Sequence, residues 1–496
     1  MSFRTSLLLS VSAILALSSP LAFAKKAPKL QFEKEQVSIG STISGELLYL
    51  ELGNGETDLL IQQSSLFKRF KNFGSASLES NVSEVTIPES AIFYNKGTLA
   101  KHGGEVLFYL TADAIVSFEV DTGVSQTLIT DKHLYSSLEV EKVRRSDFVT
   151  DINGDGLSDF VTSTFTHTNV YMQGKNGEFK KIQLEIAPRG RVYSDSVEFS
   201  LNQAHVLDIN NDGKTDLAFQ VYDRLLAFTQ TGNGELETQA VEIPLNAGLL
   251  TPKELAAQRQ KHQEEEKSGR KSVSFEALKD LNNDGVTDLI TKSSKREGIT
   301  SSVNEFQIRY GTVQQGRLTF SEQVDTKMRL EGEGELKFSD VNNDGKQDLY
   351  TLSIEIGVGA LMSLMSGSMD MDLQIFPMKT DDKFDDEASF KEEVEVSVDM
   401  DSDDNAGPVI ALEDFNGDGL KDLMLKSDDD ELNIIYGREG KRLFAKRGAK
   451  YDTDLDMTGK VDIKDINQDG KADLVFRMAY KKGESQLMRW LSKPES

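Results

Sequence analysis

Short runs in which apolar and polar residues alternate recur along almost the whole chain of 496 residues. Leu30–Ile39, Glu105–Leu110 and Leu432–Tyr436 are examples, and glycine, asparagine and aspartate separate one run from the next. Alternation with a period of two, bounded by turn residues, is typical of half-buried β-strands. The pattern therefore predicts an all-β fold of many short strands joined by tight turns.

From residue 151 onward the strands group into repeating units. Each unit has a short apolar strand, an acidic loop, a second strand that opens with Asp-Leu or Asp-Phe, a third strand that ends near a glycine turn, and a fourth strand. The loops begin at six aspartates, so that successive starts lie 57, 72, 60, 74 and 51 residues apart: Asp151, Asp208, Asp280, Asp340, Asp414 and Asp465. A four-stranded propeller blade needs roughly 40 to 60 residues, so this spacing predicts a β-propeller.

Two less regular units precede the repeats. In the first, Gly55 and Asp58 align with the acidic loop, but Leu50 and Leu52 replace its first two oxygen donors. We therefore expect no metal in this decayed copy. The second unit, residues 90–130, keeps the strand rhythm but has no acidic loop.

The ends of the chain predict how the ring closes. The last unit, residues 461–491, is one strand short, and Leu30–Ile39 forms a strand that has no unit of its own. Because closure removes the exposed sheet edges that invite aggregation, we expect this N-terminal strand to complete the last blade. The count favours eight four-stranded blades, and seven is the alternative if residues 40–130 form one expanded blade.

Two long intervals between loops contain insertions. Residues 252–271 are polar on all sides, which predicts a polar helix or a mobile loop. Residues 357–405 begin Met-rich and end acid-rich. The helical spacing of Met362, Met365 and Met369 predicts an apolar helix that packs on the propeller or docks a partner, with thioether binding of a soft metal as the alternative. The acidic part, from Asp381 to Asp404, predicts a solvated hairpin or loop.

The acidic loops carry the pattern of a cation site. Positions one, three and five alternate carboxylates and amides, glycine at six permits a positive φ, position seven offers a backbone carbonyl, and aspartate stands at nine. The candidate ligands are the residues at positions one, three, five and nine: Asp151, Asn153, Asp155, Asp159, Asp208, Asn210, Asp212, Asp216, Asp280, Asn282, Asp284, Asp288, Asp340, Asn342, Asp344, Asp348, Asp414, Asn416, Asp418, Asp422, Asp465, Asn467, Asp469 and Asp473. Hard oxygen donors favour Ca²⁺, with up to six ions; for any single loop, a metal-free turn is the alternative.

An EF-hand is excluded by the residues that follow. An EF-hand loop needs an acidic side chain at position twelve and a helix after it. Position twelve holds Thr162, Phe219, Thr291, Thr351, Leu425 and Phe476, and each lies in a strand-like run.

The motif Asp-x-Asn-x-Asp-Gly-x-x-Asp, followed by Leu or Phe, resembles the FG-GAP/VCBS repeat. This repeat builds the β-propeller of integrin α-subunits and of many bacterial exported proteins. The resemblance covers roughly residues 140–480 and implies that the loop between the first and second strands of each blade binds Ca²⁺. The N-terminal region departs from the pattern.

The first 24 residues predict a signal peptide. Arg4 precedes an apolar stretch, Leu7–Leu17, and Ala22-Phe-Ala24 is a cleavage signal. An uncleaved membrane anchor is the alternative, but the apolar stretch is short for a spanning helix. We therefore expect a periplasmic or extracellular protein in which residues 25–496 form a single propeller domain without a membrane span.

Composition limits the classes of binding partner and of chemistry that the chain can have. The chain has no cysteine, which excludes disulfides and a cysteine lipid anchor, and a formal net charge of -26, which disfavours binding to nucleic acid or anionic lipid. Its five histidines show no metal-ligand spacing, and no nucleophile or nucleotide-binding motif is present, so we predict no catalytic or cofactor-binding residues.

These features favour a monomeric, non-enzymatic scaffold that binds a protein or glycan partner, as in adhesion. A polysaccharide-acting hydrolase or lyase is the alternative, because propellers host such enzymes. A carbohydrate-binding module should show repeated exposed aromatic residues, and the single tryptophan, Trp490, argues mildly against one.

Overall fold

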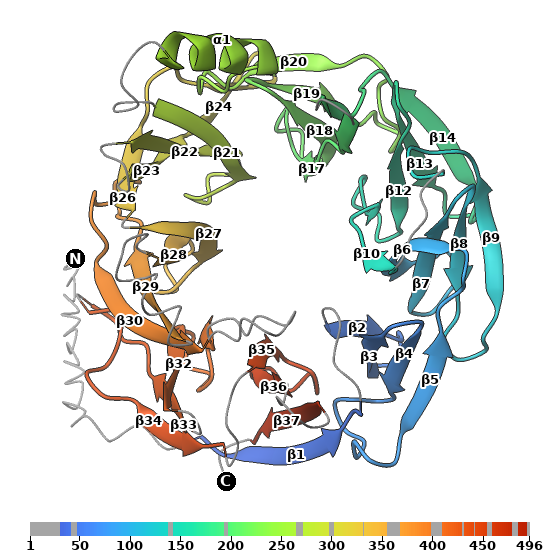
Figure 1. The fold of residues 1–496 in the computed structure, drawn as a ribbon, viewed down its shortest axis with the longest axis vertical. Helices are drawn as coiled ribbons and strands as arrows, with labels where there is room; N and C mark the ends of the chain where they lie inside the picture. Colours follow the sequence, from blue (N-terminus) through green and yellow to red (C-terminus); the bar gives the residue numbers. More distant parts are fainter. Residues whose placement is uncertain are drawn as a thin grey trace, which may run out of the picture.

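Eight sheets stand around a central channel, like the blades of a propeller (Figure 1). The computed structural model of the protein describes residues 30–40, 47–136, 142–192, 197–263, 271–296, 302–330, 332–354, 368–397, 409–428, 431–440, 442–453, 459–478 and 485–493. The expected signal peptide, residues 1–24, lies outside them. The predictions of an all-β propeller and of eight blades are both confirmed.

Within each blade the first strand of the repeat lies near the channel and the fourth lies outside. The first four blades contain these strands: blade 1, β2 (Leu47–Glu51), β3 (Thr57–Gln63), β4 (Leu66–Phe70) and β5 (Val82–Thr86); blade 2, β6 (Ala91–Thr98), β7 (Glu105–Thr111), β8 (Ala114–Phe118) and β9 (Ser125–Thr130); blade 3, β11 (Val149–Thr150), β12 (Asp159–Ser163), β13 (Thr168–Gln173) and β14 (Phe179–Leu184); blade 4, β17 (Ala204–Leu207), β18 (Asp216–Val221), β19 (Arg224–Phe228) and β20 (Val241–Pro244).

The remaining blades follow the same order, except that the last takes its outer strand from the N-terminus. They contain these strands: blade 5, β21 (Lys271–Lys279), β22 (Asp288–Arg296), β23 (Ser302–Arg309) and β26 (Thr326–Leu330); blade 6, β27 (Glu333–Ser339), β28 (Asp348–Ile354), β29 (Ser368–Phe376) and β30 (Phe390–Ser397); blade 7, β31 (Ile410–Glu413), β32 (Asp422–Asp428), β33 (Glu431–Ile435) and β34 (Ala449–Asp452); blade 8, β35 (Gly459–Lys464), β36 (Asp473–Met478), β37 (Gln486–Ser492) and β1 (Phe32–Ser38).

Four additions depart from the four-strand pattern. Strand β10 (Arg144–Arg145) runs parallel to β6 at the channel side of blade 2. Strands β15 (Arg189–Val192) and β16 (Val197–Ser200) form a hairpin between blades 3 and 4, and β24 (Gly311–Gln314) and β25 (Arg317–Phe320) form one within blade 5. Helix α1 (Pro252–Gln263) lies between β20 and β21, which confirms a helix in the insertion at 252–271. No helix of the described residues is long and apolar enough to cross a membrane.

The predicted insertion at 357–405 is wrong in part. Residues 368–376 and 390–397 are β29 and β30, the third and fourth strands of blade 6, so Met369 lies in a strand and not in a helix. The misleading signal was the spacing of three methionines. The informative one was the alternation of Met369, Met371, Leu373 and Ile375, which places these side chains on one face of β29. Met362 and Met365 lie outside the described residues.

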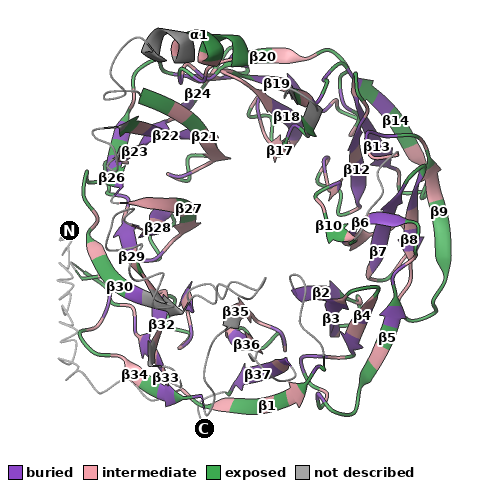
Figure 2. Cartoon of the chain, viewed as in Figure 1, coloured by how far each residue is buried: buried purple, intermediate pink, exposed green. Residues whose placement is uncertain are grey.

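Apolar side chains fill every junction between neighbouring blades. Eight buried clusters occupy the eight junctions, and each draws its residues from two consecutive blades. The middle strands face a neighbour on both sides, so β13 is buried along its whole length, while many residues of the outer strands are exposed (Figure 2). Stability is therefore spread around the ring rather than gathered in one centre.

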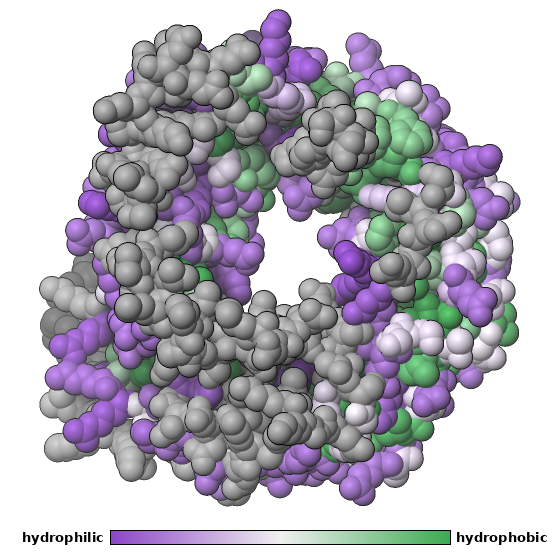
Figure 3. Space-filling model, in the orientation of Figure 1, coloured by the Kyte–Doolittle hydropathy of each residue, from purple (hydrophilic) through white to green (hydrophobic). Residues whose placement is uncertain are grey.

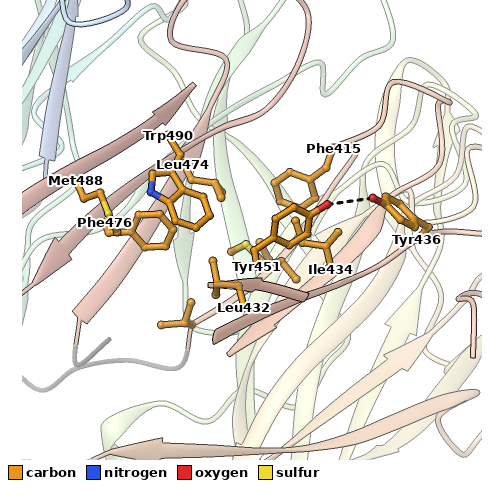
Figure 4. Close-up of a cluster of buried hydrophobic side chains, with 12 residues drawn as sticks. Phe415, Leu432, Ile434, Tyr436, Tyr451, Leu474, Phe476, Met488 and Trp490 are labelled. Atoms are coloured by element: carbon orange, nitrogen blue, oxygen red, sulfur yellow. Dashed lines mark hydrogen bonds between the residues drawn. The ribbon is translucent and has the colours of Figure 1, made fainter. Parts of the chain in front are cut away.

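The N-terminal strand closes the ring as predicted. Strand β1 pairs antiparallel with β37, from Phe32 opposite Ser492 to Ser38 opposite Gln486. Trp490 is fully buried between Phe32 and Phe476, at ring-centroid distances of 5.3 and 5.2 Å. The cluster continues into blade 7, where the hydroxyls of Tyr436 and Tyr451 lie 3.3 Å apart (Figure 4).

Polar contacts reinforce the closure on the other side of the last blade. The side chain of Arg489 on β37 is buried and donates to the backbone carbonyls of Phe73 and Ala76 in blade 1. Its Nη2 also lies 2.6 Å from Oε2 of Glu35 on β1. One arginine thus ties together the first strand, the first blade and the last blade.

Candidate metal-binding loops

All six predicted loops lie in the same place in the last six blades. Each connects the first strand of its blade to the second, for example β11 to β12 in blade 3 and β35 to β36 in blade 8. Strands, not helices, follow the loops, which confirms that they are not EF-hands. Because equivalent connections of a propeller lie at one end of its blades, the structure brings the six loops to one face of the ring.

The first aspartate of each loop organises its backbone. Its Oδ2 atom accepts a hydrogen bond from the N–H of the glycine at position six, at 2.7–2.9 Å in all six loops. Its Oδ1 accepts from the N–H of position five, at 3.0–3.2 Å. The chain therefore curls around this carboxylate.

Positions three and five continue the curl. The side-chain oxygen of asparagine at three accepts from the N–H of position five, and that of aspartate at five accepts from the N–H of position seven, as in Asn153 to Asp155 and Asp155 to Leu157. The glycine at six has a φ of 82° to 88° in all six loops, which confirms the predicted role of glycine there.

Position four also has a positive φ, which the sequence reasoning missed. The residues there are Gly154, Asn211, Asn283, Asn343, Gly417 and Gln468, with φ between 56° and 77°. Glycine and asparagine tolerate this conformation best, so their presence in five of the six loops was an available signal.

The aspartate at position nine has a structural role that the sequence did not reveal. Its side chain is fully buried in all six loops. Oδ2 accepts from the N–H of position two at 2.8–3.1 Å. Oδ1 accepts from a backbone N–H just after or at the end of the third strand, at 2.6–3.0 Å. The residue clamps the loop to the centre of its own blade.

Position two anchors the loop in the core. It holds Ile152, Ile209, Leu281, Val341, Phe415 and Ile466, and each is at most 2% exposed. Its backbone N–H meets the buried carboxylate of position nine, so that one residue fixes the loop by an apolar contact and a hydrogen bond. An apolar residue at this position in every copy was the signal that could have revealed the anchor.

The environment of the position-nine carboxyls disfavours their charge. Burial raises the pKa of Asp159, Asp288 and Asp422 to about 7 and that of Asp348 to about 6. The aspartates at positions one and five raise these pKa values further by repulsion, whereas the two backbone donors lower them. The pKa of Asp216 and Asp473 is raised by burial as well.

The donor chemistry of the loops fits a hard divalent cation. Each loop offers four side-chain oxygen donors and no soft ligand. Among the described residues, the only ion pair of these side chains joins Lys214 Nζ to Asp212 Oδ2 at 3.6 Å. As the side chains stand, no three carboxylate or histidine groups of the described chain converge as a metal centre, because the loop oxygens face backbone N–H groups. Positions one, three, five and nine, with the carbonyl of position seven, are the residues that would hold an ion.

In the decayed loop of blade 1, the buried carboxylate at position nine is paired with an arginine of the same blade. Asp58, at its position nine, is 1% exposed and forms an ion pair with Arg69, which is 2% exposed. Asp58 Oδ1 still accepts from the N–H of Asn72 at 2.8 Å, as its counterparts do in the other blades. Arg69 Nη2 also meets Asp121 of blade 2 at 2.6 Å. Here a built-in cation compensates the carboxylate at position nine.

Comparison with known families agrees with this geometry. The FG-GAP-like repeat family matches residues 151–219, a segment that contains the first two loops and the strands between them. Residues 151–219 thus match an FG-GAP-like repeat, and the whole chain is an eight-bladed β-propeller. The other four acidic loops, which start at residues 280, 340, 414 and 465, repeat the same hydrogen bonds.

No curated protein matches this chain by sequence. Among solved structures, an Agrocybe aegerita lectin that recognises non-reducing terminal N-acetylglucosamine is 12% identical, with a TM-score of 0.42, over 84% of this chain and 92% of the lectin. Kluyveromyces lactis Hsv2p is 10% identical, with a TM-score of 0.33, over 83% and 99%. The V. cholerae biofilm matrix protein Bap1 is 10% identical, with a TM-score of 0.26, over 89% and 76%.

Proposed function

We propose that this protein is an exported, calcium-stabilised propeller that binds a protein or glycan partner without chemical catalysis. The observation that carries the calcium part is the repetition of one oxygen-rich loop, with the same hydrogen bonds, in six consecutive blades. Four acidic or amide side chains crowded in one turn repel each other unless a cation offsets their charge. Calcium would supply that charge and would hold the turn, so its binding free energy would add to folding stability.

The scaffold part of the proposal is supported by departures from the repeat. The β15–β16 hairpin and helix α1 connect the end of one blade to the start of the next, so they lie at the end of the blades opposite the acidic loops. At that end Phe165 is 58% exposed and Phe199 38% exposed, and their rings meet edge to face at 5.2 Å. Figure 3 shows a hydrophobic area over this part of the ring. Exposed apolar patches of this kind mark interaction surfaces.

The test is thermal unfolding of residues 25–496 with calcium and with a chelator. At free calcium of about 100 times the dissociation constant, each occupied site adds roughly 2.7 kcal/mol, so chelation should lower the midpoint by several degrees. Added Ca²⁺ should restore the midpoint. An unchanged midpoint, together with no calcium in the purified protein, would overturn the proposal.

A further inference from the structure

A short basic segment lies on the channel side of blade 2, where no other blade has a fifth strand among the described residues. It comprises Lys142, Arg144 and Arg145, and all three are exposed. Arg144 and Arg145 form β10, which pairs with Phe93 and Tyr94 of β6 and projects toward the channel in Figure 1. We call Lys142–Arg145 the basic strip.

Buried side chains hold the backbone of the basic strip. Gln62, 3% exposed, donates from Nε2 to the carbonyl of Val143 at 2.7 Å. Asn95, 6% exposed, donates from Nδ2 to the carbonyl of Ser146 at 2.8 Å and accepts from Arg145 Nε at 3.4 Å. Two amides from blades 1 and 2 thus fix a segment that the four-stranded blade does not need. Such support positions a functional surface in advance.

Two of the three cations of the basic strip have no ionic partner among the described residues. Neither Lys142 nor Arg144 forms an ion pair with another described residue. Glu51 of the neighbouring β2 is engaged by Lys464 at 2.9 Å, and Glu105 of β7 by Lys96 at 2.6 Å. In a chain of net charge -26, these exposed cations attract an anionic ligand to one place.

The geometry selects among anionic ligands. Lys142 lies in a bend two residues before Arg144, which begins β10, so the two exposed cations leave neighbouring points of one short segment. Two neighbouring cations suit a chain that carries anions at intervals, and the guanidinium of Arg144 can bind a carboxylate through two hydrogen bonds. A polypeptide cannot add a useful β-ladder to a strand of two residues. Its carboxylates also end on flexible side chains that lose entropy on binding, whereas ring-bound carboxylates lose less.

We propose that the basic strip in the channel binds an acidic polysaccharide through carboxylates on its sugar rings. The inference rests on the proposed function, because it names the partner class of the binding scaffold. It assigns the contact to Lys142 and Arg144, with Arg145 held in place by Asn95.

The test measures binding of residues 25–496 to hyaluronan oligosaccharides by calorimetry, in about 1 mM Ca²⁺. Dextran serves as the neutral polysaccharide and poly-L-glutamate as the acidic peptide. The variant Lys142→Gln/Arg144→Gln is compared with Lys175→Gln/Lys253→Gln, which removes two exposed charges elsewhere. Thermal midpoints of both variants, measured in parallel, show whether each still folds.

We expect hyaluronan to bind, dextran not to bind, and salt to weaken binding because it screens exposed charges. The strip variant should bind at least about tenfold more weakly, the loss expected for one charge-assisted hydrogen bond, and the control variant should bind like the wild type. Equal affinity of the wild type and a folded strip variant, or equal binding of dextran or poly-L-glutamate, would overturn the inference. A chelator-sensitive midpoint without hyaluronan binding would leave the proposed function standing.

Discussion

At the scale of single residues, the aspartate at position nine connects the acidic loop to the buried centre of its blade and carries a buried carboxyl. Asp288 is fully buried and accepts from Leu281 N at 2.8 Å and from Gly311 N at 3.0 Å. Its two oxygens serve two different segments of the blade. Burial raises the pKa of this carboxyl, whereas the two hydrogen bonds that it accepts lower the pKa. Burial thus disfavours the charged form, and the hydrogen bonds favour it.

The substitution Asp288→Asn tests this clamp. An amide has one oxygen where the carboxylate has two, so one buried N–H must lose its acceptor. We expect a loss of about 1–3 kcal/mol in the free energy of unfolding, measured by denaturant titration in calcium. Asp381→Asn, at an exposed position, is the matched control and should change stability by less than about 0.5 kcal/mol. Equal stability of the two variants would exclude the clamp.

His205 gives a prediction about pH. Its ring packs edge to face on Phe275 at 5.5 Å, Nε2 has no hydrogen-bond partner within the described part of the chain, and burial lowers its pKa. A histidine whose folded-state pKa lies below its unfolded value binds fewer protons when folded, so its contribution to stability is present above about pH 6.5 and is lost as pH falls through the folded pKa.

The variant His205→Phe should therefore gain stability relative to the wild type as the pH is lowered from about 7 to 5. Denaturant unfolding at several pH values measures this difference, and His167→Phe, in the half-buried turn after β12, is the control. A constant difference between His205→Phe and the wild type across this range would contradict the prediction.

At the scale of elements, blade 1 shows how a propeller can lose an acidic loop and keep its fold. Leucines at positions 50 and 52 replace two donors, and Arg69 supplies positive charge to Asp58. The hydrogen bond from Asn72 N to Asp58 is retained. The blade therefore keeps the clamp, and Arg69 stands in for the metal ion proposed for the other loops.

The substitution Arg69→Met should lower the free energy of unfolding strongly when made alone, and only mildly when Asp58 is replaced as well. Alone it leaves Asp58 buried without a counter-charge, for which a loss of about 3–5 kcal/mol is expected. In Asp58→Asn/Arg69→Met the charge is removed from both sides, so much of the loss should be recovered. A double-mutant cycle of unfolding free energies measures the coupling, and additive losses would show that the pair is not coupled.

Prediction from sequence succeeded where the repeat was regular. The strands of each blade, the position of the acidic loops and the closing strand at Leu30–Ile39 follow from alternation and from the spacing of six loops. It failed at β29, where three methionines imitated a helical period, and it did not find β10, because two arginines beside each other carry no period at all. The clamp by position nine was hidden because a buried aspartate and an ion-binding aspartate look alike in sequence.

At the scale of the whole molecule, closure depends on a strand from the opposite end of the chain. Strand β1 covers β37, and its Phe32 packs on Trp490. Glu35 on the same strand pairs with Arg489. Ile39, just after β1, packs with Leu59 and Ile61 of blade 1, so the N-terminal segment also joins the first blade to the last.

Deletion of residues 25–39 should open the ring. The loss of the buried Ile39 alone costs about 1.5–3 kcal/mol, and the uncovered β37 becomes an exposed edge. We expect a lower thermal midpoint and self-association in size-exclusion chromatography. Deletion of residues 25–29, which spares β1, is the control. A monomer with an unchanged midpoint would show that β1 is dispensable.

The pairing of β1 with β37 also has a consequence for how the protein is made. As the chain folds, blades can stack one after another, but the last blade stays incomplete until β37, with Trp490 and Ser492, is available to pair with β1. Until then the ring has two free ends, and apolar side chains such as Ile61 of blade 1 and Ile434 of blade 7 have no neighbouring blade to cover them. A chain that stops early therefore keeps adhesive surfaces at both ends and remains open to proteases and chaperones. The ring can close only in a chain that contains both β1 and β37.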